Sequence, residues 1–566
     1  MPNDDDDSQS NALAHMLIDA GLATEEQLEQ VYEEQERSGV PFTDSLYNFG
    51  IIQEHELLQI IADNLGTEFV DLKTVSPPPD LVERIPANIV RMYNILPIYE
   101  EDEILYVVAV EPMNFRMIDE LPYVIGQEVI VRVARPDEIM NAIEHFYPEG
   151  MNDSMTDLIA EMHHFEDDFD EEDDADVEEL MNSTPIVRFV NVILYQAVKD
   201  LASDIHFEPF ADEFKIRYRI DGALYEMTPP PKHLANPVIS RVKVISGLDI
   251  AERRLPQDGR IQLRVAGRKI DLRVSTLPTQ YGESVVLRVL DKTVVSLDID
   301  ALGLPDQIRD DLRTLIAKPN GIILVTGPTG SGKTTTLYSC LKEINSIEDK
   351  ILTAEDPVEY NIEGLMQVPI NDAVGMTFAK ALRSFLRQDP DRIMLGEIRD
   401  LETAQMAIQA SLTGHLVLST LHTNDAPGAI TRLVDMGVEP FLITSSVEGI
   451  MAQRLVRRIC VNCKVSYDPP DIELEALGLD RDEVGVMQFA YGKGCKECND
   501  TGYKGRKGIY ELFILTPIIR DMVNDRQPAT VLTAKAHEEG MRSLREDGIR
   551  SIIDEISTVE EVLKYT

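Results

Sequence analysis

From residue 13 to residue 65, apolar residues recur at three- and four-residue spacing, as in helices that bury one face. The pattern repeats with a period of 29 residues, so that apolar and glycine positions of the first copy return in the second. The matched pairs are Leu17 and Leu46, Gly21 and Gly50, Leu28 and Leu57, and Val31 and Ile60. Each copy predicts a short helix, a glycine stop and a second helix. We therefore expect a helical repeat module over residues 1–65.

Strand-like segments replace this pattern after residue 65. The apolar runs 103–110 and 128–133 are typical of strands, and helical spacing flanks them at 79–93 and 136–145. Together they predict a small α/β domain over residues 66–148, in which no catalytic group is evident.

A block of acidic residues comes next. Residues 166–179 hold eleven Asp and Glu in fourteen positions and no basic residue. Such a block cannot bury apolar surface, because its charges remain solvated. Residues 149–184 are therefore expected to form a flexible linker.

Residues 185–298 combine one helical pattern with strict alternation. Residues 185–202 predict an amphipathic helix, and residues 204–291 alternate as an antiparallel sheet does, with a turn at 266–267. One face of the expected sheet is apolar and the other is rich in arginine. The arginines are Arg217, Arg219, Arg260, Arg264, Arg273 and Arg288. A solvated face explains such alternation, but six arginines in so acidic a chain also suggest an anion nearby.

After residue 299 strand and helix patterns alternate, which predicts a mostly parallel sheet over residues 299–455. Four short apolar runs stand out, and each ends in polar residues. The runs are 321–326, 351–354, 392–396 and 416–421. Ligands of open α/β sheets bind outside the carboxyl ends of the strands, so these polar residues are expected to meet at one edge.

The first run leads into a phosphate-binding loop of the pattern G-x-x-x-x-G-K-[ST], followed by a helix. Such a loop directs backbone N–H groups and a helix N-terminus at phosphate oxygens, with Lys333 reaching the β- and γ-phosphates and the Thr334 hydroxyl binding Mg²⁺. The alternative is a glycine-rich turn without a ligand. The expected nucleotide-binding residues are Gly327, Pro328, Thr329, Gly330, Ser331, Gly332, Lys333, Thr334 and Thr335.

The other three runs supply candidates for ATP hydrolysis, which needs a metal clamp, an oriented water and positive charge on the phosphates. Glu397 follows the third strand, and because Gly396 replaces the usual Asp we expect it to hold a Mg²⁺-bound water. Glu355, at the end of the second, is the candidate that orients the attacking water. His422 follows the fourth and either senses the γ-phosphate or has a structural role.

Four of the five cysteines form two CxxC pairs, Cys460 with Cys463 and Cys495 with Cys498. Two such knuckles can close a tetrahedral thiolate site, and Zn²⁺ suits it in a reducing compartment. With no open ligand position the site is expected to be structural. We assign residues 456–514 to this zinc-binding module. Residues 515–566 are expected to form C-terminal helices, around 518–524, 529–539 and 549–566.

The chain has 566 residues and a net charge of −47. This charge argues against general nucleic-acid affinity, because there is no surplus cation to release phosphate counterions. No window reaches about 18 consecutive apolar residues, and the acidic N-terminus is unlike a signal peptide. We therefore expect a cytoplasmic protein whose membrane role runs through partners.

Several motifs together resemble the secretion ATPase superfamily, most closely its type II secretion and type IV pilus assembly branch. Besides the phosphate loop they are Ala-Glu-Asp-Pro-Val-Glu (354–359), Leu-Arg-Gln-Asp-Pro-Asp (386–391), Gly-Glu-Ile-Arg-Asp (396–400), Leu-Thr-Gly-His (412–415), Ser-Thr-Leu-His-Thr-Asn (419–424) and Ala-Gln-Arg-Leu (452–455). The resemblance implies a multidomain α/β protein with a RecA-like P-loop ATPase core, preceded by a small α+β, PAS-like domain and by helical and α/β N-terminal modules, with a four-cysteine zinc insertion.

The same resemblance implies a cytoplasmic homo-hexamer, docked on an inner-membrane platform protein, in which ATP turnover drives assembly of pilin or pseudopilin subunits. It also assigns arginines to the nucleotide. Arg273 and Arg288 lie where the preceding domain of the family supplies them, and Arg383 and Arg387 match a motif of the motor domain. Guanidinium groups suit the charge of a transferring phosphoryl group, often across a subunit boundary, although each arginine could instead form a surface ion pair.

The sequence argues against two rival functions. A nucleic-acid motor is disfavoured by the acidic balance and by the lack of an aromatic and basic groove pattern. A non-hydrolysing scaffold is disfavoured by the intact Lys333, Thr334 and acidic motifs. Some relatives bind a cyclic dinucleotide through Arg-Leu-Gly and Pro-Leu-Gly runs. Ala12-Leu13-Ala14 and Pro41-Phe42-Thr43 replace those runs here, which argues against such binding.

Overall fold

The computed structural model divides the chain into two compact units, Met1–Thr293 and Val294–Thr566, which are described in turn. It describes residues 13–18, 20–38, 42–73, 75, 77–147, 181, 183–265, 268–291, 297–481 and 488–566. Most of the expected acidic linker, residues 149–184, therefore lies outside the described residues, as does the turn at 266–267.

The first unit begins with helices that share one small core. They include α2 (Glu25–Ser38), α3 (Phe42–Asn48) and α4 (Glu54–Asn64). The repeat-related Leu17 and Leu46 are both fully buried in this core. Gly21 and Gly50 end their turns with φ angles of 71° and 66°, a conformation that glycine adopts at little cost. The 29-residue period of the sequence thus corresponds to two equivalent helical units.

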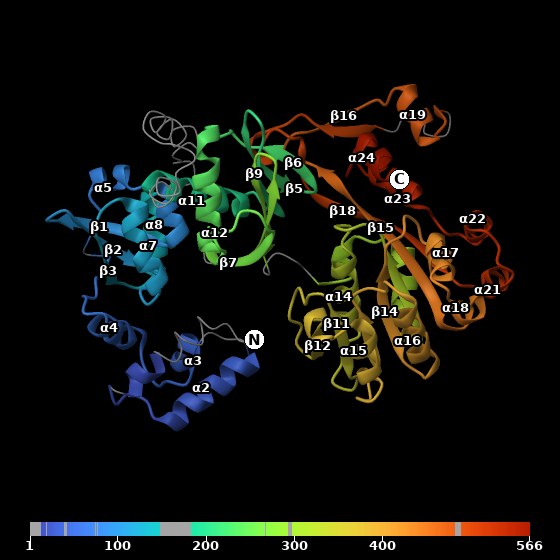
Figure 1. Ribbon diagram of the computed structural model, residues 1–566, viewed down its shortest axis with the longest axis horizontal. Helices are drawn as coiled ribbons and strands as arrows, with labels where there is room; N and C mark the ends of the chain where they lie inside the picture. The colour runs from blue at the N-terminus through green and yellow to red at the C-terminus, as the bar shows by residue number, and fades with distance from the viewer. Residues whose placement is uncertain are drawn as a thin grey trace. The chain divides into compact units, whose positions relative to one another are not determined.

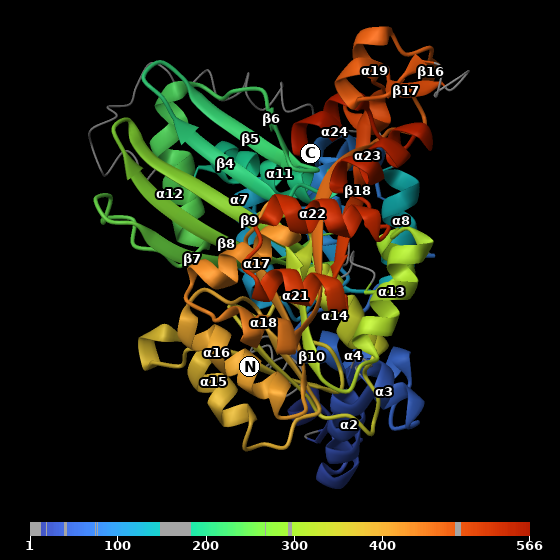
Figure 2. The same ribbon diagram turned by 90° about the vertical axis from the view of Figure 1, so that its right-hand side faces the viewer.

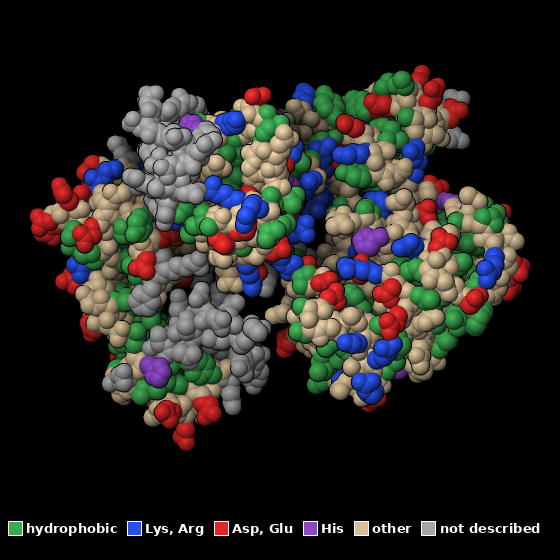
Figure 3. All heavy atoms as spheres, in the orientation of Figure 1, with side chains coloured by type: hydrophobic (Ala, Val, Ile, Leu, Met, Phe, Trp, Pro, Cys, Tyr) green, Lys and Arg blue, Asp and Glu red, His purple; other side chains and the backbone are tan. Residues whose placement is uncertain are grey.

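A three-stranded sheet with helices around it follows the helical module. Its strands are β1 (Ile95–Glu101), β2 (Ile104–Ala109) and β3 (Val129–Val133), and its helices are α5 (Pro79–Arg84), α6 (Ala87–Tyr93), α7 (Phe115–Ile125) and α8 (Pro136–Phe146). β1 pairs with β2 antiparallel, and β2 pairs with β3 parallel. Figure 3 shows acidic side chains at the left edge of the view, over the β1–β2 turn, where Glu101, Asp102 and Glu103 are exposed.

The rest of the first unit is a six-stranded sheet in the order β6-β5-β4-β9-β8-β7, antiparallel at every pairing (Figure 2). Its strands are β4 (Asp204–Pro209), β5 (Phe214–Ile220), β6 (Ala223–Glu226), β7 (Gln257–Val265), β8 (Arg268–Thr279) and β9 (Gly282–Asp291). Helices α11 (Thr184–Lys199) and α12 (Ala235–Ile245) share a core with the apolar side chains of these strands. Phe214, Ile216 and Tyr218 are buried as the alternation predicts.

The second unit is built on a seven-stranded sheet in the order β12-β11-β13-β14-β10-β15-β18, parallel except for β18 (Figure 1). The strands are β10 (Gly321–Thr326), β11 (Ile351–Glu355), β12 (Leu365–Pro369), β13 (Arg392–Leu395), β14 (Leu416–Leu421), β15 (Val447–Ile459) and β18 (Tyr503–Ile514). The four runs singled out in the sequence are the adjacent strands β11, β13, β14 and β10. The expected boundary between residues 455 and 456 falls within β15.

Alternate residues of these strands fill two cores, one on each face of the sheet. Ile323 and Val325 of β10 pack with α13 (Asp306–Ile316) and α14 (Lys333–Glu343). Ile322 and Leu324 face a larger set of helices on the other side. That set includes α15 (Phe378–Phe385), α16 (Leu401–Leu412), α17 (Pro427–Asp435), α18 (Pro440–Ser446), α21 (Pro517–Asn524) and α22 (Ala529–Glu538). The sheet is thus covered on both faces, as parallel sheets usually are.

The segment between β15 and β18 contains a two-stranded sheet, with one cysteine pair before its first strand and the other after its second. Its elements are β16 (Lys464–Tyr467), α19 (Asp471–Leu477) and β17 (Phe489–Gly492). The sequence suggested one last helix over 549–566, and this was wrong. The structure has α23 (Leu544–Ile553) and α24 (Val559–Tyr565), separated where Glu555 adopts a φ of 53° and Thr558 caps α24. No helix in the described ranges has the length and apolarity needed to cross a bilayer.

Candidate nucleotide site and metal centre

The phosphate-binding loop joins the end of β10 to the start of α14, as its sequence requires. Gly327, Gly330 and Gly332 have φ angles of 148°, 78° and 89°. A Cβ on Gly327 would lie 2.6 Å from the carbonyl oxygen of Gln453, so a side chain cannot be accommodated there. Residues 328–330 are exposed, and Thr334 and Thr335 lie in the first turn of α14. A helix N-terminus behind a glycine-rich loop is suited to bind phosphate.

The Lys333 ammonium folds over this loop. Its Nζ donates to the carbonyl oxygens of Gly327 at 2.9 Å and Pro328 at 3.0 Å. Burial lowers the pKa of Lys333, the nearby Arg454 lowers it further, and Glu397 opposes both effects. A desolvated cation held among carbonyl oxygens is suited to pair with a phosphate oxygen, which would restore its charge balance.

Two of the expected catalytic side chains meet at the carboxyl edge of the sheet. Glu397 follows β13 and His422 follows β14, and the His422 Nε2 lies 3.3 Å from a Glu397 carboxylate oxygen. The other oxygen of Glu397 accepts a hydrogen bond from Arg399. Partial burial raises the pKa of Glu397, but Arg399 and His422 outweigh it and hold the pKa below its ordinary value. Arg399 was quoted in a motif of the sequence but given no role.

The Glu355 carboxylate is held by protein donors on both oxygens. Thr353 Oγ1 donates to one oxygen at 2.5 Å and Gln367 Nε2 to the same oxygen at 3.0 Å, while the Tyr338 hydroxyl donates to the other. Glu355 is only 3% exposed. Burial and the adjacent carboxylate raise the pKa of Tyr338, so its hydroxyl keeps its proton. Because Tyr338 belongs to α14, this bond links Glu355 to the helix that starts at Lys333.

Two residues of β15 contact loops at the site, Gln453 the phosphate loop and Arg454 the loop after β14, and the sequence pattern gave neither of them a role. Gln453 Nε2 donates to the carbonyl oxygen of Ser331 at 2.7 Å, and its Oε1 accepts from Thr336 at 2.8 Å. Arg454 donates to the carbonyl oxygen of Asn424 at 2.7 Å. The available signal was a polar pair inside an otherwise apolar strand pattern, which usually marks a buried polar contact.

Arg383 and Arg387 of the expected set lie on or just after α15, on the surface. Arg383 forms an ion pair with Glu402, and Arg387 donates to the carbonyl oxygen of Arg383 at 2.8 Å. In the described part of the chain, the partners of these two arginines are Glu402, the Arg383 carbonyl oxygen and the Ser384 hydroxyl. None of these partners belongs to the phosphate loop.

Arg273 and Arg288 belong to the first unit, where β8 and β9 place them directly opposite each other. Arg288 is 60% exposed, and its Nε lies 3.1 Å from the Asp204 carboxylate. Like charges opposite one another in a sheet repel, so the carboxylate offsets part of that cost. The register thus places the two arginine side chains on the same face of the sheet. The side chain of Arg264, from the same set, lies outside the described residues.

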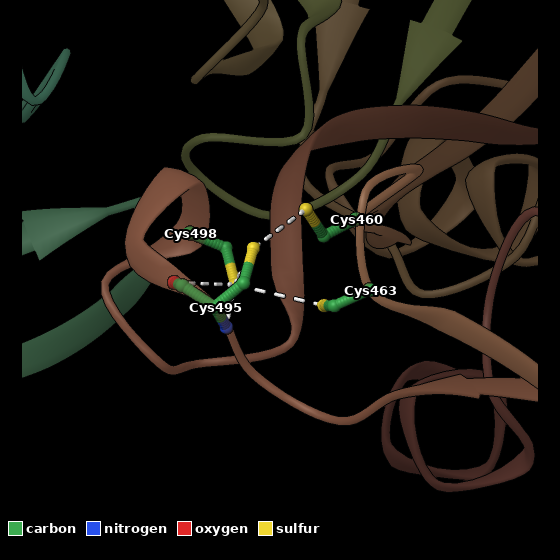
Figure 4. A group of neighbouring side chains, drawn as sticks. All are labelled: Cys460, Cys463, Cys495 and Cys498. Atoms are coloured by element: carbon green, nitrogen blue, oxygen red, sulfur yellow. Dashed lines mark hydrogen bonds between the residues drawn. The ribbon is translucent and has the colours of Figure 1, made fainter.

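The four cysteines converge from two separate turns, as Figure 4 shows. Their Sγ atoms all lie within 4.8 Å of one another, with Cys460 and Cys495 at 3.8 Å, Cys463 and Cys498 at 3.8 Å, and Cys495 and Cys498 at 3.6 Å. Sulfurs bound to one tetrahedral zinc are separated by about 3.8 Å, given Zn–S bonds of about 2.3 Å. The backbone N–H of Gly502 also donates to the Cys498 sulfur at 3.3 Å. The donor set and its spacing therefore fit Zn²⁺.

Curated proteins of similar sequence extend over nearly the whole chain. The "Type IV pilus assembly ATPase PilB" of Myxococcus xanthus is 42% identical over 98% of this chain and 99% of its own length. The "Type II secretion system protein E" of Xanthomonas campestris pv. campestris is 41% identical over 99% of both chains. The PilB of Pseudomonas aeruginosa is 38% identical over 99% of both.

Comparison with solved structures supports the fold. The ATPase DotB of Legionella pneumophila aligns with 66% of this chain and 94% of its own, with a TM-score of 0.50 and 23% identity. The MshEN domain family matches residues 65–153. The family described as "Type II/IV secretion system protein" matches residues 179–564, well over half of the sequence. By that match and by its full-length relatives, the chain belongs to the type II/IV secretion system protein family.

Proposed function

We propose that this protein is an ATP hydrolase whose turnover drives assembly of a pilus or pseudopilus, in a type IV pilus or a type II secretion system. The full-length similarity to proteins named as a pilus assembly ATPase and as a secretion system protein E supports this proposal. The single observation that carries the enzymatic part is the meeting of Glu397 and His422 at the sheet edge where the phosphate loop ends.

Each side chain then has a distinct task. The backbone of residues 327–332 and the N-terminus of α14 bind the triphosphate, with Lys333 on the β- and γ-phosphates. Thr334 and, through a water, Glu397 would hold Mg²⁺, which would neutralise charge on the phosphate oxygens. Glu355 orients the attacking water, and His422 senses the γ-phosphate. The carboxylate of Glu355 is already fixed by three donors, so its direction is set before substrate binds.

The four arginines provide positive charge for the transferring phosphoryl group in this proposal. Arg273 and Arg288 act together from a neighbouring subunit, because their register places both on one face of the sheet. Arg383 and Arg387 also act on a neighbour's nucleotide, since in their own chain both are exposed and bind Glu402 and the Arg383 carbonyl oxygen. Both assignments require an oligomer, and a homo-hexamer is the form we propose.

The hexamer would work in the cytoplasm on the inner face of the membrane, docked on a platform protein and acting on pilin or pseudopilin subunits through that protein. On the face shown in Figure 3, basic and acidic side chains are interspersed over the lower part of the second unit. This mixture is consistent with a motor that does not bind nucleic acid directly. For the reasons given by its sequence, we expect the N-terminal module not to bind a cyclic dinucleotide.

The ATPase proposal is tested by the purified full-length protein and its Lys333→Ala variant. We expect Mg²⁺-dependent phosphate release from the wild type and a loss of at least about 100-fold in the variant, because the lysine contacts the phosphates in the transition state. Arg526→Gln, which changes an exposed ion pair with Glu439, is the matched control. Undiminished hydrolysis by a folded Lys333→Ala protein would refute the assigned site, and stimulation by DNA would favour a nucleic-acid motor.

A further inference from the structure

Two buried, oppositely charged side chains lie on the paired strands β15 and β18 and contact the loop that follows β14. Arg454 of β15 and Glu511 of β18 are 7% and 5% exposed. Glu511 is the register partner of Ala452, and Arg454 is two residues further along the same strand. Since residues two apart on a strand point to the same side of a sheet, both side chains belong to the same face.

The two side chains hold successive points of one loop. Arg454 donates to the carbonyl oxygen of Asn424 at 2.7 Å, and Glu511 accepts from the backbone N–H of Ala426 at 2.8 Å. This loop connects β14 to α17 and starts with His422. Arg454 therefore holds the loop at Asn424, and Glu511 holds it two residues later, at Ala426.

The same loop is also tied to the start of the phosphate loop. Thr326, the last residue of β10, accepts from the backbone N–H of Thr423 at 2.9 Å. Arg454 Nη1 donates to the Gln453 carbonyl oxygen at 3.0 Å and would lie 3.1 Å from a Cβ placed on Gly327. One guanidinium thus lies beneath the phosphate loop and holds the His422 loop at the same time.

Because Arg454 and Glu511 are both buried, their charges destabilise the fold unless each keeps its partners. Burial lowers the pKa of Arg454, and the carboxylates of Asp425 and Glu511 oppose this. Burial raises the pKa of Glu511, and the N–H of Ala426 opposes it. A buried charge that loses its partners is strongly unfavourable, so removing either residue should free the loop as well as destabilise the sheet locally.

We propose that Arg454 and Glu511 are positioning residues for nucleotide hydrolysis, which hold the loop 422–426 so that His422 stays against Glu397 beside the phosphate loop. This inference rests on the proposed function, since it assumes that His422 and Glu397 act on the nucleotide. Neither Arg454 nor Glu511 needs to touch ATP. Their effect passes through the 3.3 Å contact between His422 and Glu397.

The test is a double-mutant cycle in the full-length protein, with MgATP as the probe. We expect Arg454→Gln to lower kcat about tenfold or more with little change in KM, because a misplaced catalytic group slows the chemical step. His422→Ala should lower kcat as well. In the His422→Ala background, Arg454→Gln should have an effect below about threefold, because residues that act as a unit are not additive.

The Glu511→Gln variant removes the charge of Glu511 but keeps an acceptor for the Ala426 N–H, so it separates the effect of the charge from that of the hydrogen bond. The amide oxygen can still accept from Ala426, so we expect a smaller loss of kcat than in Glu511→Ala, in which the acceptor is gone. Arg432→Gln is the matched control, since Arg432 is exposed on α17, just after the loop, and should leave kcat unchanged. Thermal unfolding and size-exclusion chromatography establish that each variant is folded and assembled.

Full additivity of Arg454→Gln with His422→Ala would overturn the proposal, as would a folded Arg454→Gln protein with wild-type kcat. If Arg454→Gln does not fold, Arg454→Lys and Glu511→Gln decide the question in the same cycle. A His422→Ala protein with normal kcat would also overturn it, while leaving the ATPase proposal intact. Only the absence of Mg²⁺-dependent hydrolysis by the folded wild-type protein removes the proposed function itself.

Discussion

At the scale of single residues, the protonation state of Glu397 depends on the charged side chains around it. Glu397 contacts His422 on one oxygen and Arg399 on the other, and both contacts keep its carboxylate ionised. A carboxylate that must hold a Mg²⁺-bound water has to stay ionised throughout the working pH range. In the proposed mechanism, Arg399 would therefore extend activity to lower pH, although its own side chain is more than half exposed.

This role predicts a shift in the pH profile of Arg399→Gln. Loss of the guanidinium removes an interaction that depresses the pKa of Glu397, so that pKa rises. Activity that requires the ionised form is lost as pH falls through the pKa, and the acid limb of kcat should therefore move to higher pH. Measuring kcat from about pH 5 to pH 8 checks this. An unchanged acid limb in a folded variant would contradict the assignment.

A second prediction concerns the hydroxyl that Tyr338 donates to Glu355. Tyr338→Phe leaves one oxygen of a buried carboxylate without its donor, which should cost about 1–3 kcal/mol of the free energy of unfolding. It should also lower kcat, because Glu355 loses its link to α14. Denaturant unfolding and steady-state kinetics measure the two effects. Tyr491→Phe, at a half-exposed ring of β17, is the control; equal behaviour of both variants would argue against the link.

At the scale of elements, the sequence predicted the centre of the sheet better than its edges. β10, β11, β13 and β14 are continuous apolar runs because helices cover both faces, and such runs are easily recognised. β12 and β15 were not predicted as strands. β12 lies at the edge and exposes Met366. β15 contains Gln453 and Arg454, whose polar groups bind the phosphate loop and the loop 422–426.

The residues of the candidate site were likewise predicted only in part from the sequence. Glu397 and His422 were predicted from their position after strands, because the carboxyl ends of parallel strands converge. Arg399, Tyr338 and Gln453 contribute through contacts between segments far apart in sequence or through a side-chain direction, which no local pattern encodes. The arginines were assigned by resemblance, and what they contact in an oligomer lies beyond a single chain.

The cysteine segment connects the end of β15 to the start of β18, so a metal there should stabilise both strands. Cys463→Ser is expected to lower the zinc content from about one ion per chain to near zero and to lower the Tm by several degrees. Elemental analysis and thermal unfolding test this. Cys340→Ala, which changes a buried cysteine of α14, should leave the zinc content unchanged. Equal zinc content in Cys463→Ser and wild type would refute the four-cysteine site.

At the scale of the whole molecule, the proposed mechanism divides the catalytic groups between the two units. Lys333, Glu355, Glu397 and His422 belong to the second unit, and Arg273 and Arg288 to the first. If the arginines serve a neighbouring chain, a monomer is incomplete as a catalyst. Assembly and hydrolysis are then coupled, which is a useful property in a motor that should not consume ATP before it has assembled.

Mixing two inactive variants distinguishes this arrangement from one within a single chain. Arg288→Gln and Lys333→Ala should each lack most activity alone. In a mixed hexamer some interfaces pair an intact Lys333 with an intact Arg288 of the neighbour, so activity should reappear, to at most about a quarter of wild type for equal and random mixing. If the arginine served its own chain, every site would remain defective. Mixed hexamers that form, as shown by two different tags, but stay inactive would therefore exclude action across the subunit boundary.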